Sequence, residues 1–312
     1  MMDREHDKIL LVIDGGGTKT RALIAPLHNP QTPSLAQTEA GPSNFGQVGS
    51  EGLTRVLREV MAGVPESLRQ VSAVAAGLAG VGRDTERQKA EETLRQVFPN
   101  IPLLVRTDAE LAYYGAFGLK PNGILVIAGT GSIAWTRLPD GKFLRAGGWG
   151  PLLGDEGGGA WLGREALRLC LTEEENRSLG PLSQAILKTV EITKASDILT
   201  LVYQQGWGPD KWATLAPLVF RYADRDSSAH ELTKRTGIVL AQLAGRLIAR
   251  IPMPSRPVSI AVVGGLTVHW QLLEPSFGRE LAKESRFHFE IVKSLGDALF
   301  GGRLLAQEAE FR

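Results

Sequence analysis

The sequence predicts an α/β fold made of two similar halves, and three observations support this prediction. Apolar segments at 8–26 and 123–138 are each interrupted by a glycine-rich turn. After each of these two segments, strand and helix patterns alternate along the sequence, which is typical of mostly parallel sheets covered by helices. A third apolar run, at 258–263, is followed directly by Gly264 and Gly265. No Ser/Pro-rich linker separates the halves. The boundary is placed within GLKPNG, 118–123, which gives a first domain at 1–120 and a second at 121–312.

The first half is expected to begin with strands because its apolar runs are short and are bounded by Gly and Pro. Pro26 would break a helix that started at Gly17, so the run between them is interpreted as a second strand. The expected strands are 8–13, 20–25, 34–39, 71–77 and 101–108, and the expected helices are 50–62, 84–97 and 109–118.

The second half repeats this order and then becomes richer in helices. The expected strands are 123–128, 132–138, 142–146, 258–263 and 286–292. Helices are expected at 156–171, several times across 180–250, near 270–283 and from about 296 to the end. Whether the final helix packs back on the first domain is left open.

The first glycine-rich turn, DGGGTKT, fits neither of two familiar phosphate motifs. The P-loop needs Gly-Lys-Ser/Thr, which is absent, and Thr20 stands where a dinucleotide fingerprint needs its third glycine. We therefore interpret the segment as a hairpin whose tip, Gly15, Gly16 and Gly17, allows unusual φ/ψ values and a close approach of backbone N–H groups to an anion. Thr18 and Lys19 would add a hydroxyl and a charge. An ordinary tight turn is the alternative.

Composition narrows the class of protein. Hydrophobic residues make up 43% of the 312 residues, which is enough for one large or two medium cores. The net charge of +1 argues against a nucleic-acid partner or a polybasic membrane anchor. No run approaches the roughly 18 apolar residues of a membrane span, and the charged start does not resemble a signal peptide. The expected location is therefore the cytoplasm, and Cys170, the one cysteine, is expected in the core.

These motifs together resemble a known superfamily. The two hairpins and the late Gly-Gly turn look like the phosphate and adenosine motifs of the actin, Hsp70 and sugar-kinase superfamily. GTGS followed by GGWGPLLGDEGGGAWLGREAL resembles the N-acetylglucosamine kinases within the BadF/BadG/BcrA/BcrD ATPase family. The resemblance implies two ribonuclease-H-like (actin-like ATPase) domains around a nucleotide cleft, with ATP and Mg²⁺ as cofactors. It also implies a homodimer.

Asp108 is the candidate catalytic base. It follows a predicted strand and precedes a helix, which is where ligands meet open α/β sheets. There it could take a proton from an attacking hydroxyl, although an N-cap role is common for Asp at such a place. The resemblance favours the base.

The remaining site residues follow largely from the resemblance. It implies ATP contacts from Gly15, Gly16, Gly17, Thr18, Lys19, Thr130, Gly131, Gly264 and Gly265, and sugar contacts from Asn44, Asp108, Thr130, Gly148, Trp149 and Asp155. Asp14, at the end of the first strand, could hold Mg²⁺ through water. Asn44 could instead be a turn residue. Asp155 and Glu156 could instead cap the helix that follows them.

The predicted activity is ATP-dependent phosphorylation of an amino sugar, N-acetylglucosamine or glucosamine, at its 6-hydroxyl. One alternative is a kinase for a related sugar such as N-acetylmuramate. Another is a BadF-type ATPase or regulatory module without sugar transfer. Members of this family that hold an iron–sulfur cluster use cysteines from each subunit, and Cys170 inside a predicted helix does not match that pattern.

Overall fold

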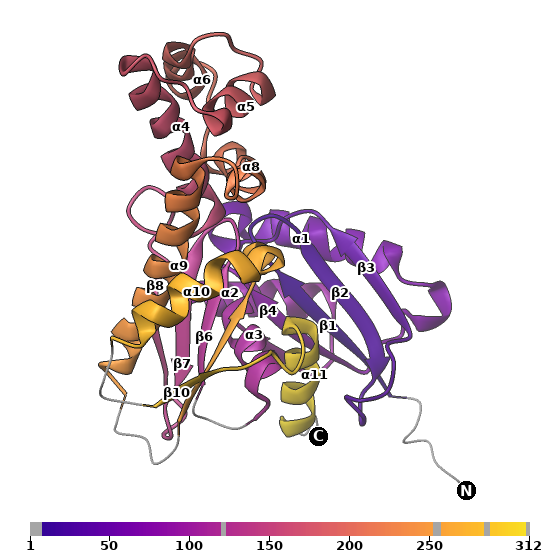
Figure 1. The fold of residues 1–312 in the computed structure, drawn as a ribbon. Coiled ribbons are helices and arrows are strands. Elements are labelled where there is room, and N and C mark those ends of the chain that lie inside the picture. The colour runs from indigo at the N-terminus through magenta and orange to yellow at the C-terminus, as the bar shows by residue number, and fades with distance from the viewer. Residues whose placement is uncertain (1–7, 120–122, 252–256, 284–287, 310–312) are drawn as a thin grey trace, which may run out of the picture. The chain divides into compact units, whose positions relative to one another are not determined.

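The computed structural model describes residues 8–119, 123–251, 257–283 and 288–309, and the chain divides into two compact units. The first unit is Met1–Lys120 with Lys293–Arg312, and the second is Pro121–Val292. The C-terminal helix therefore belongs to the first unit, although it follows the second unit in sequence (Figure 1).

The first unit is a five-stranded sheet with the strand order β3-β2-β1-β4-β5. Its strands are β1 (Ile9–Gly15), β2 (Thr20–Pro26), β3 (Ala36–Ala40), β4 (Ala73–Leu78) and β5 (Leu103–Arg106). Strands β1 to β3 form antiparallel pairs, whereas β1, β4 and β5 run parallel. The carboxyl ends of β1, β3, β4 and β5 consequently lie at one edge of the sheet.

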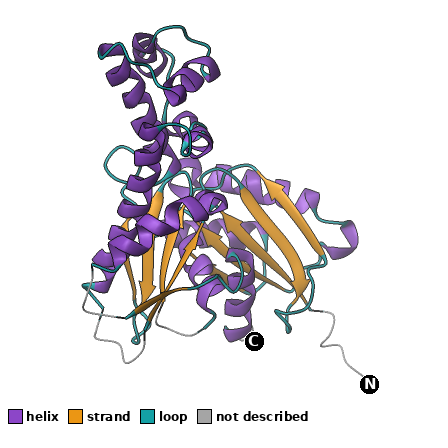
Figure 2. Ribbon diagram, in the orientation of Figure 1, coloured by secondary structure: helices purple, strands orange, loops and turns teal. Residues whose placement is uncertain are grey.

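Helices cover both faces of this sheet (Figure 2). They are α1 (Phe45–Gly63), η1 (Glu66–Leu68), α2 (Asp84–Val97), α3 (Asp108–Phe117) and α11 (Ala298–Glu308). Leu11 and Ile13 point into the core formed with α1 and α2, while Val12, between them, faces Gly302 of α11. Because both faces are covered, β1 is a continuous apolar run rather than an alternating one.

Glycines bring α3 and α11 into close contact. A Cβ atom on Gly301 would overlap with the backbone oxygen of Leu111, and one on Gly115 would lie 2.6 Å from the carbonyl carbon of Asp297. No larger residue fits at either position without moving a helix. The sequence-distant α11 is thus tightly packed within the first unit.

The second unit repeats the strand arrangement of the first. Its strands are β6 (Gly123–Ala128), β7 (Ser132–Arg137), β8 (Phe143–Gly147), β9 (Val258–Val263) and β10 (Phe289–Ile291). The order β8-β7-β6-β9-β10 corresponds, strand for strand, to the order in the first unit, again with one antiparallel set and one parallel set. The predicted fold of two similar α/β halves is confirmed.

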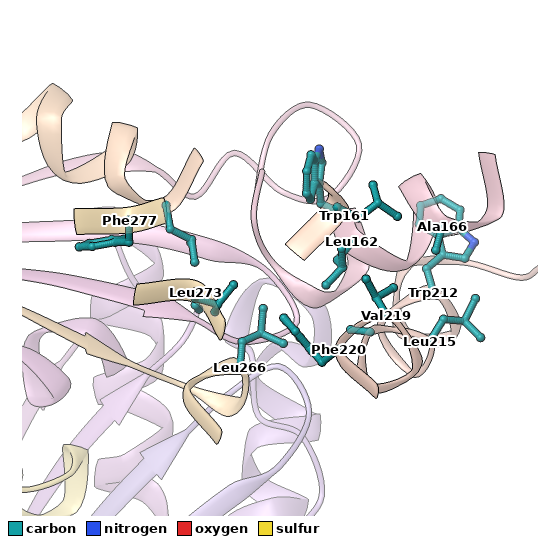
Figure 3. Packing of buried hydrophobic residues seen from close by; sticks show 14 of the residues in the cluster. Trp161, Leu162, Ala166, Trp212, Leu215, Val219, Phe220, Leu266, Leu273 and Phe277 are labelled. Carbon is teal, nitrogen blue, oxygen red and sulfur yellow. The ribbon is translucent and has the colours of Figure 1, made fainter. Parts of the chain in front are cut away.

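The second unit contains most of the helices. They are α4 (Gly159–Glu175), α5 (Pro181–Thr189), η2 (Ala195–Asp197), α6 (Ile198–Tyr203), α7 (Pro209–Ala213), α8 (Ala216–Tyr222), α9 (Ser227–Ile248), η3 (Gly265–His269) and α10 (Trp270–Leu281). Apolar side chains from α4, α7, α8, η3 and α10 meet in a single core (Figure 3). Cys170 of α4 is fully buried in this core, as predicted.

Several predicted boundaries differ from the structure by two to five residues, as for the predicted helix 156–171, which is α4 at 159–175, and two further cases follow. The first helix begins at Phe45, five residues before the predicted start. Gly49 adopts a non-helical conformation (φ 61°, ψ −168°) that separates a short first turn from the main helix, and the prediction covered only the main helix. The predicted strand 286–292 is seen as β10 at 289–291, and its residues 286 and 287 lie outside the described residues. Among the helices of the described chain, we find none with the length and hydropathy that a bilayer span needs.

Candidate active site

The glycine-rich hairpin between β1 and β2 is present as predicted, but its glycines are needed for a different reason. Gly15, Gly16 and Gly17 all lie outside the left-handed region of φ. Gly15 is instead crowded, since a Cβ atom there would overlap with Ser43 Oγ and lie 2.7 Å from a methyl carbon of Leu78. Positive φ is therefore not the reason for glycine in this turn. The missing side chains allow neighbouring groups to approach its backbone closely.

The exposed tip of the hairpin carries Thr18 and Lys19. The Lys19 ammonium pairs with Glu39 at 2.6 Å, and both side chains are more than half exposed. Such a pair at the surface contributes little stability, so Lys19 is able to exchange this partner for a phosphate.

Asp14, the penultimate residue of β1, belongs to a charged group of three residues. The Arg21 guanidinium donates to Asp14 Oδ2 from Nη2 at 2.6 Å and from Nε at 3.2 Å. Its Nη1 donates to Asp297 Oδ2 at 2.8 Å. Burial raises the pKa of Asp14, and the bond from Arg21 acts in the opposite direction. Arg21 thus ties the first strand to the start of α11.

Asn44 lies at the same edge of the sheet and is the N-cap of α1. Its Oδ1 accepts from Gly46 N at 3.1 Å, and a Cβ atom on Gly17 would lie 4.0 Å from its Nδ2. A Cβ atom on Gly80, after β4, would overlap with Asn44 Oδ1. The capping role occupies only the oxygen, so the Nδ2 donor faces the hairpin tip.

Asp108 is not the N-cap of α3, which removes the alternative explanation for its presence. The N-cap is Thr107, whose Oγ1 accepts from Glu110 N at 3.1 Å while Glu110 Oε2 accepts from Thr107 N at 2.8 Å. Asp108 is the first residue of the helix, and its Oδ1 accepts from Ala109 N at 2.9 Å. The capping box is complete without it.

The environment of Asp108 raises its basicity. Burial, and after it the negative charge of Asp14, raise the pKa of Asp108 to about 6. A carboxylate with a pKa near the working pH is a better proton acceptor than one near 4. Strongly shifted carboxyl groups of this kind are candidates for catalytic work.

In the second unit, the turn between β6 and β7 is packed against the loop that precedes α4. The carbonyls of Gly129 and Thr130 accept from Gly159 N and Ala160 N, both at 2.8 Å. A Cβ atom on Gly131 would overlap with Asp155 Oδ2. Thr130 itself is exposed. The turn therefore presents an exposed hydroxyl next to a carboxylate.

Asp155 does not cap α4, so that alternative is wrong. The N-cap of α4 is Gly158, and Asp155 Oδ1 accepts instead from Gly150 N at 3.1 Å. Asp155 has φ 58°, which is uncommon for a residue with a side chain. Burial raises its pKa, with Glu156 adding to the rise. Strained residues of this kind are concentrated at functional sites.

The loop from Gly148 to Gly154 holds Trp149 at the surface. Gly148 and Gly150 have φ of 67° and 86°. Trp149 is 63% exposed, and the Arg145 guanidinium lies 4.7 Å from its ring centroid. The loop has a defined shape because Arg164 donates to Pro151 O at 3.2 Å. An exposed aromatic ring beside a carboxylate can contact a sugar through its apolar face.

The Gly264–Gly265 turn follows β9 at the carboxyl edge of the second sheet. Gly264 has φ 107°, and a Cβ atom there would lie 2.7 Å from the carbonyl carbon of Ala128, the last residue of β6. Gly265 has open space around it. This turn thus lies at the end of the strand that leads into Thr130.

No group of three or more His, Cys, Asp or Glu side chains within the described residues could hold a metal ion. Mg²⁺ in kinases is usually held by one or two carboxylates, water and the phosphates of the substrate, so it needs no such group. Asp14 fits this role, since Arg21 engages only its Oδ2 in the contacts described above.

Sequence reasoning missed several residues that the structure places beside the candidate site residues Asp14, Asp108 and Trp149. They are Arg21, Thr107, Arg145 and Asp297. Thr107 could have been found, because Thr-x-x-Glu before a helix is the signature of a capping box. Arg21 and Asp297 are 276 positions apart, and no local pattern joins them.

Comparison with known proteins gives consistent results. An N-acetylmuramic acid/N-acetylglucosamine kinase of Clostridium acetobutylicum is 29% identical, covering 96% of this chain and 98% of its own. A Chromobacterium violaceum structure with a provisional N-acetylglucosamine kinase assignment is 31% identical, with coverage of 96% and 99% and a TM-score of 0.75. A glucokinase of the ROK family from Streptomyces griseus shares the fold, at 19% identity, coverage of 96% and 99%, and a TM-score of 0.64. The model of the BadF/BadG/BcrA/BcrD ATPase family matches residues 11–301, and this chain belongs to that family.

Proposed function

We propose that this chain is an ATP-dependent kinase that transfers the γ-phosphoryl group to the 6-hydroxyl of an amino sugar, N-acetylglucosamine or glucosamine. The observation that carries the proposal is Asp108, a half-buried carboxylate with a raised pKa that the capping box does not use. A carboxylate held at this cost to stability needs a functional explanation. The name of the Clostridium acetobutylicum relative, a kinase of N-acetylmuramic acid and N-acetylglucosamine, supports the same reaction.

Asp108 is the base in this proposal. As the 6-oxygen of the sugar forms its bond to the γ-phosphorus, the bond from that phosphorus to the bridging oxygen of ADP breaks. The hydroxyl proton moves to the Asp108 carboxylate. Positioning and charge stabilisation account for most of the catalysis in such a transfer.

The glycine turns are assigned to the nucleotide. The proposal includes that turns from both units bind one ATP molecule. The hairpin tip of the first unit, Gly15 to Lys19, and the turns of the second unit, Thr130–Gly131 and Gly264–Gly265, would contact it through backbone N–H groups and hydroxyls. Asp14 would hold Mg²⁺ through water. The ion, when bound, neutralises charge on the phosphates.

The sugar contacts are assigned to polar groups around Trp149. Asp155 accepts hydrogen bonds from ring hydroxyls, and its charge makes those bonds stronger than neutral ones. Asn44 supplies an amide donor, and Gly148 and Thr130 lie on the two segments that pack around Asp155. A homodimer and a cytoplasmic location belong to this proposal as well, and rest on the family and on composition.

The test is an ADP-release assay across hexoses, hexosamines and their N-acetyl and lactyl derivatives, with the product position read by NMR. We expect ADP release that depends on an amino sugar, with phosphate on the 6-oxygen. Release that is equally fast without any sugar would instead support an ATPase module. Phosphate on the anomeric oxygen would leave the kinase but overturn the assigned acceptor.

A further inference from the structure

Arg145 is an exposed cation held beside the loop that we assign to the sugar. It lies in β8, and its guanidinium is 4.7 Å from the centroid of the Trp149 ring. Its Nη1 also donates to the carbonyl of Gly148 at 3.2 Å. The backbone carbonyl of Arg145 accepts from Arg250 Nη1 at 2.8 Å. These contacts fix the position of the guanidinium and leave its other N–H donors available.

A second arginine–tryptophan contact in the chain provides a comparison for Arg145 and Trp149. Arg235 lies over Trp161 in the same manner, at 5.4 Å from the ring centroid, but its charge is paired with Glu165 at 3.6 Å. Across the described ranges, no carboxylate forms an ion pair with Arg145. A cation fixed on an aromatic ring is a normal packing device. A cation fixed in this way without a counter-charge, at a substrate loop, has a free site for an anion.

We propose that Arg145 binds a carboxylate on the C3 substituent of the sugar, so that the substrate range includes 3-O-lactyl amino sugars such as N-acetylmuramic acid. This inference rests on the proposed function, because it takes Trp149 and Asp155 as sugar contacts. The planar guanidinium presents paired N–H donors that match the two oxygens of a carboxylate. The carboxylate carbon of the lactyl group is three bonds from C3 of the sugar, so it can extend beyond the edge of the Trp149 ring while the sugar contacts that ring.

Charge makes this contact testable apart from general sugar binding. N-Acetylglucosamine has no ionised group, so its binding has no ion pair to lose. For the lactyl sugar, the contact to Arg145 is an exposed ion pair, which salt weakens. We therefore expect the KM for N-acetylmuramic acid, measured from 0.02 to 0.5 M KCl, to rise more steeply than the KM for N-acetylglucosamine.

The decisive experiment measures kcat/KM for both sugars in the unmodified enzyme and in the variants Arg145→Gln, Arg145→Lys and Arg235→Gln. We expect Arg145→Gln to lower the ratio of N-acetylmuramic acid to N-acetylglucosamine efficiency at least tenfold. Lysine keeps the charge but loses the paired donors, so its ratio should fall between the two. Arg235→Gln removes a cation from a tryptophan elsewhere and should leave the ratio as it is.

The outcomes separate this inference from the function on which it rests. Phosphorylation of N-acetylglucosamine without any of N-acetylmuramic acid overturns the role of Arg145 and leaves the kinase assignment standing. A loss of efficiency that is equal for both sugars in Arg145→Gln also overturns it, because Arg145 would then only support Trp149. Phosphorylation of glucosamine but of neither N-acetylated sugar overturns only the role of Arg145. If the unmodified enzyme phosphorylates none of the three sugars, the proposed function itself fails.

Discussion

Replacing Asp108 by asparagine should make the protein more stable and far less active. Burial raises the pKa of Asp108 to about 6 from an ordinary value of 3.8. Holding this group ionised above pH 6 therefore destabilises the fold by up to about 3 kcal/mol, at about 1.4 kcal/mol for each pKa unit. Asparagine keeps the oxygen that accepts from Ala109 N but carries no charge. We expect a gain of about 1–3 kcal/mol in the free energy of unfolding at pH 8.

The sign of the pH dependence follows from the same shift. The folded pKa lies above the unfolded one, so the folded protein binds the extra proton between about pH 4 and 6. The destabilisation by ionised Asp108 is complete above the folded pKa and disappears as pH falls through this window. The advantage of Asp108→Asn should therefore shrink when urea unfolding is measured at pH 5 instead of pH 8.

Two further measurements separate catalysis from helix capping. Turnover of Asp108→Asn on its best sugar should fall about a hundredfold or more, the scale of a positioned base. In the control variant Thr107→Ala, which removes the actual cap, stability should fall by about 1 kcal/mol while turnover changes little. An Asp108→Asn protein that is no more stable than the unmodified chain at pH 8 would show that the buried charge has no cost. One that turns over sugar normally would show that Asp108 is not the base.

The pH dependence of sugar phosphorylation and two glycine variants provide further tests. The value of kcat/KM for sugar should fall about tenfold per pH unit below about pH 6, because Asp108 must be ionised to accept a proton; a profile flat down to pH 4.5 would contradict the raised pKa. Gly131→Ala should raise the KM for sugar about tenfold or more, since the new Cβ overlaps with the Asp155 carboxylate, and an unchanged KM in steady-state assays would separate Asp155 from the sugar. Gly301→Ala should lower the free energy of unfolding by about 1–3 kcal/mol, because its Cβ overlaps with the backbone of Leu111; equal urea midpoints would show that α11 has room to move.

Most of the fold could be predicted from the sequence because its strands end at glycine turns. Apolar runs such as 123–128 stop where Gly and Ser begin, and the strand boundaries at both hairpins agree with the structure to within about two residues. The late start predicted for α1 has a local cause. Gly49 lies in a non-helical conformation, and the turn before it contains too few apolar residues to produce a helical period.

The sequence predicted which residues are candidates for the site, but not the hydrogen bonds and ion pairs between them. Asp108 was identified as a candidate, and its N-cap alternative stayed open although Thr107 and Glu110 carry the Thr-x-x-Glu signature of a capping box. The structure confirms that box through reciprocal hydrogen bonds. The link between Asp14 and Asp297 through Arg21 joins the two ends of the chain. Such contacts depend on tertiary packing, which periodicity does not report.

Sub-saturating initial rates on glucose, glucosamine and N-acetylglucosamine test whether this enzyme phosphorylates an amino sugar in preference to a plain hexose. In the proposed site, the Asn44 amide would pair with the nitrogen-bearing substituent, and glucose would leave that amide without its partner. We expect the better amino sugar to exceed glucose in kcat/KM by at least tenfold, or about 1.4 kcal/mol. Equal or higher efficiency on glucose would contradict the amino-sugar assignment and leave a general hexose kinase.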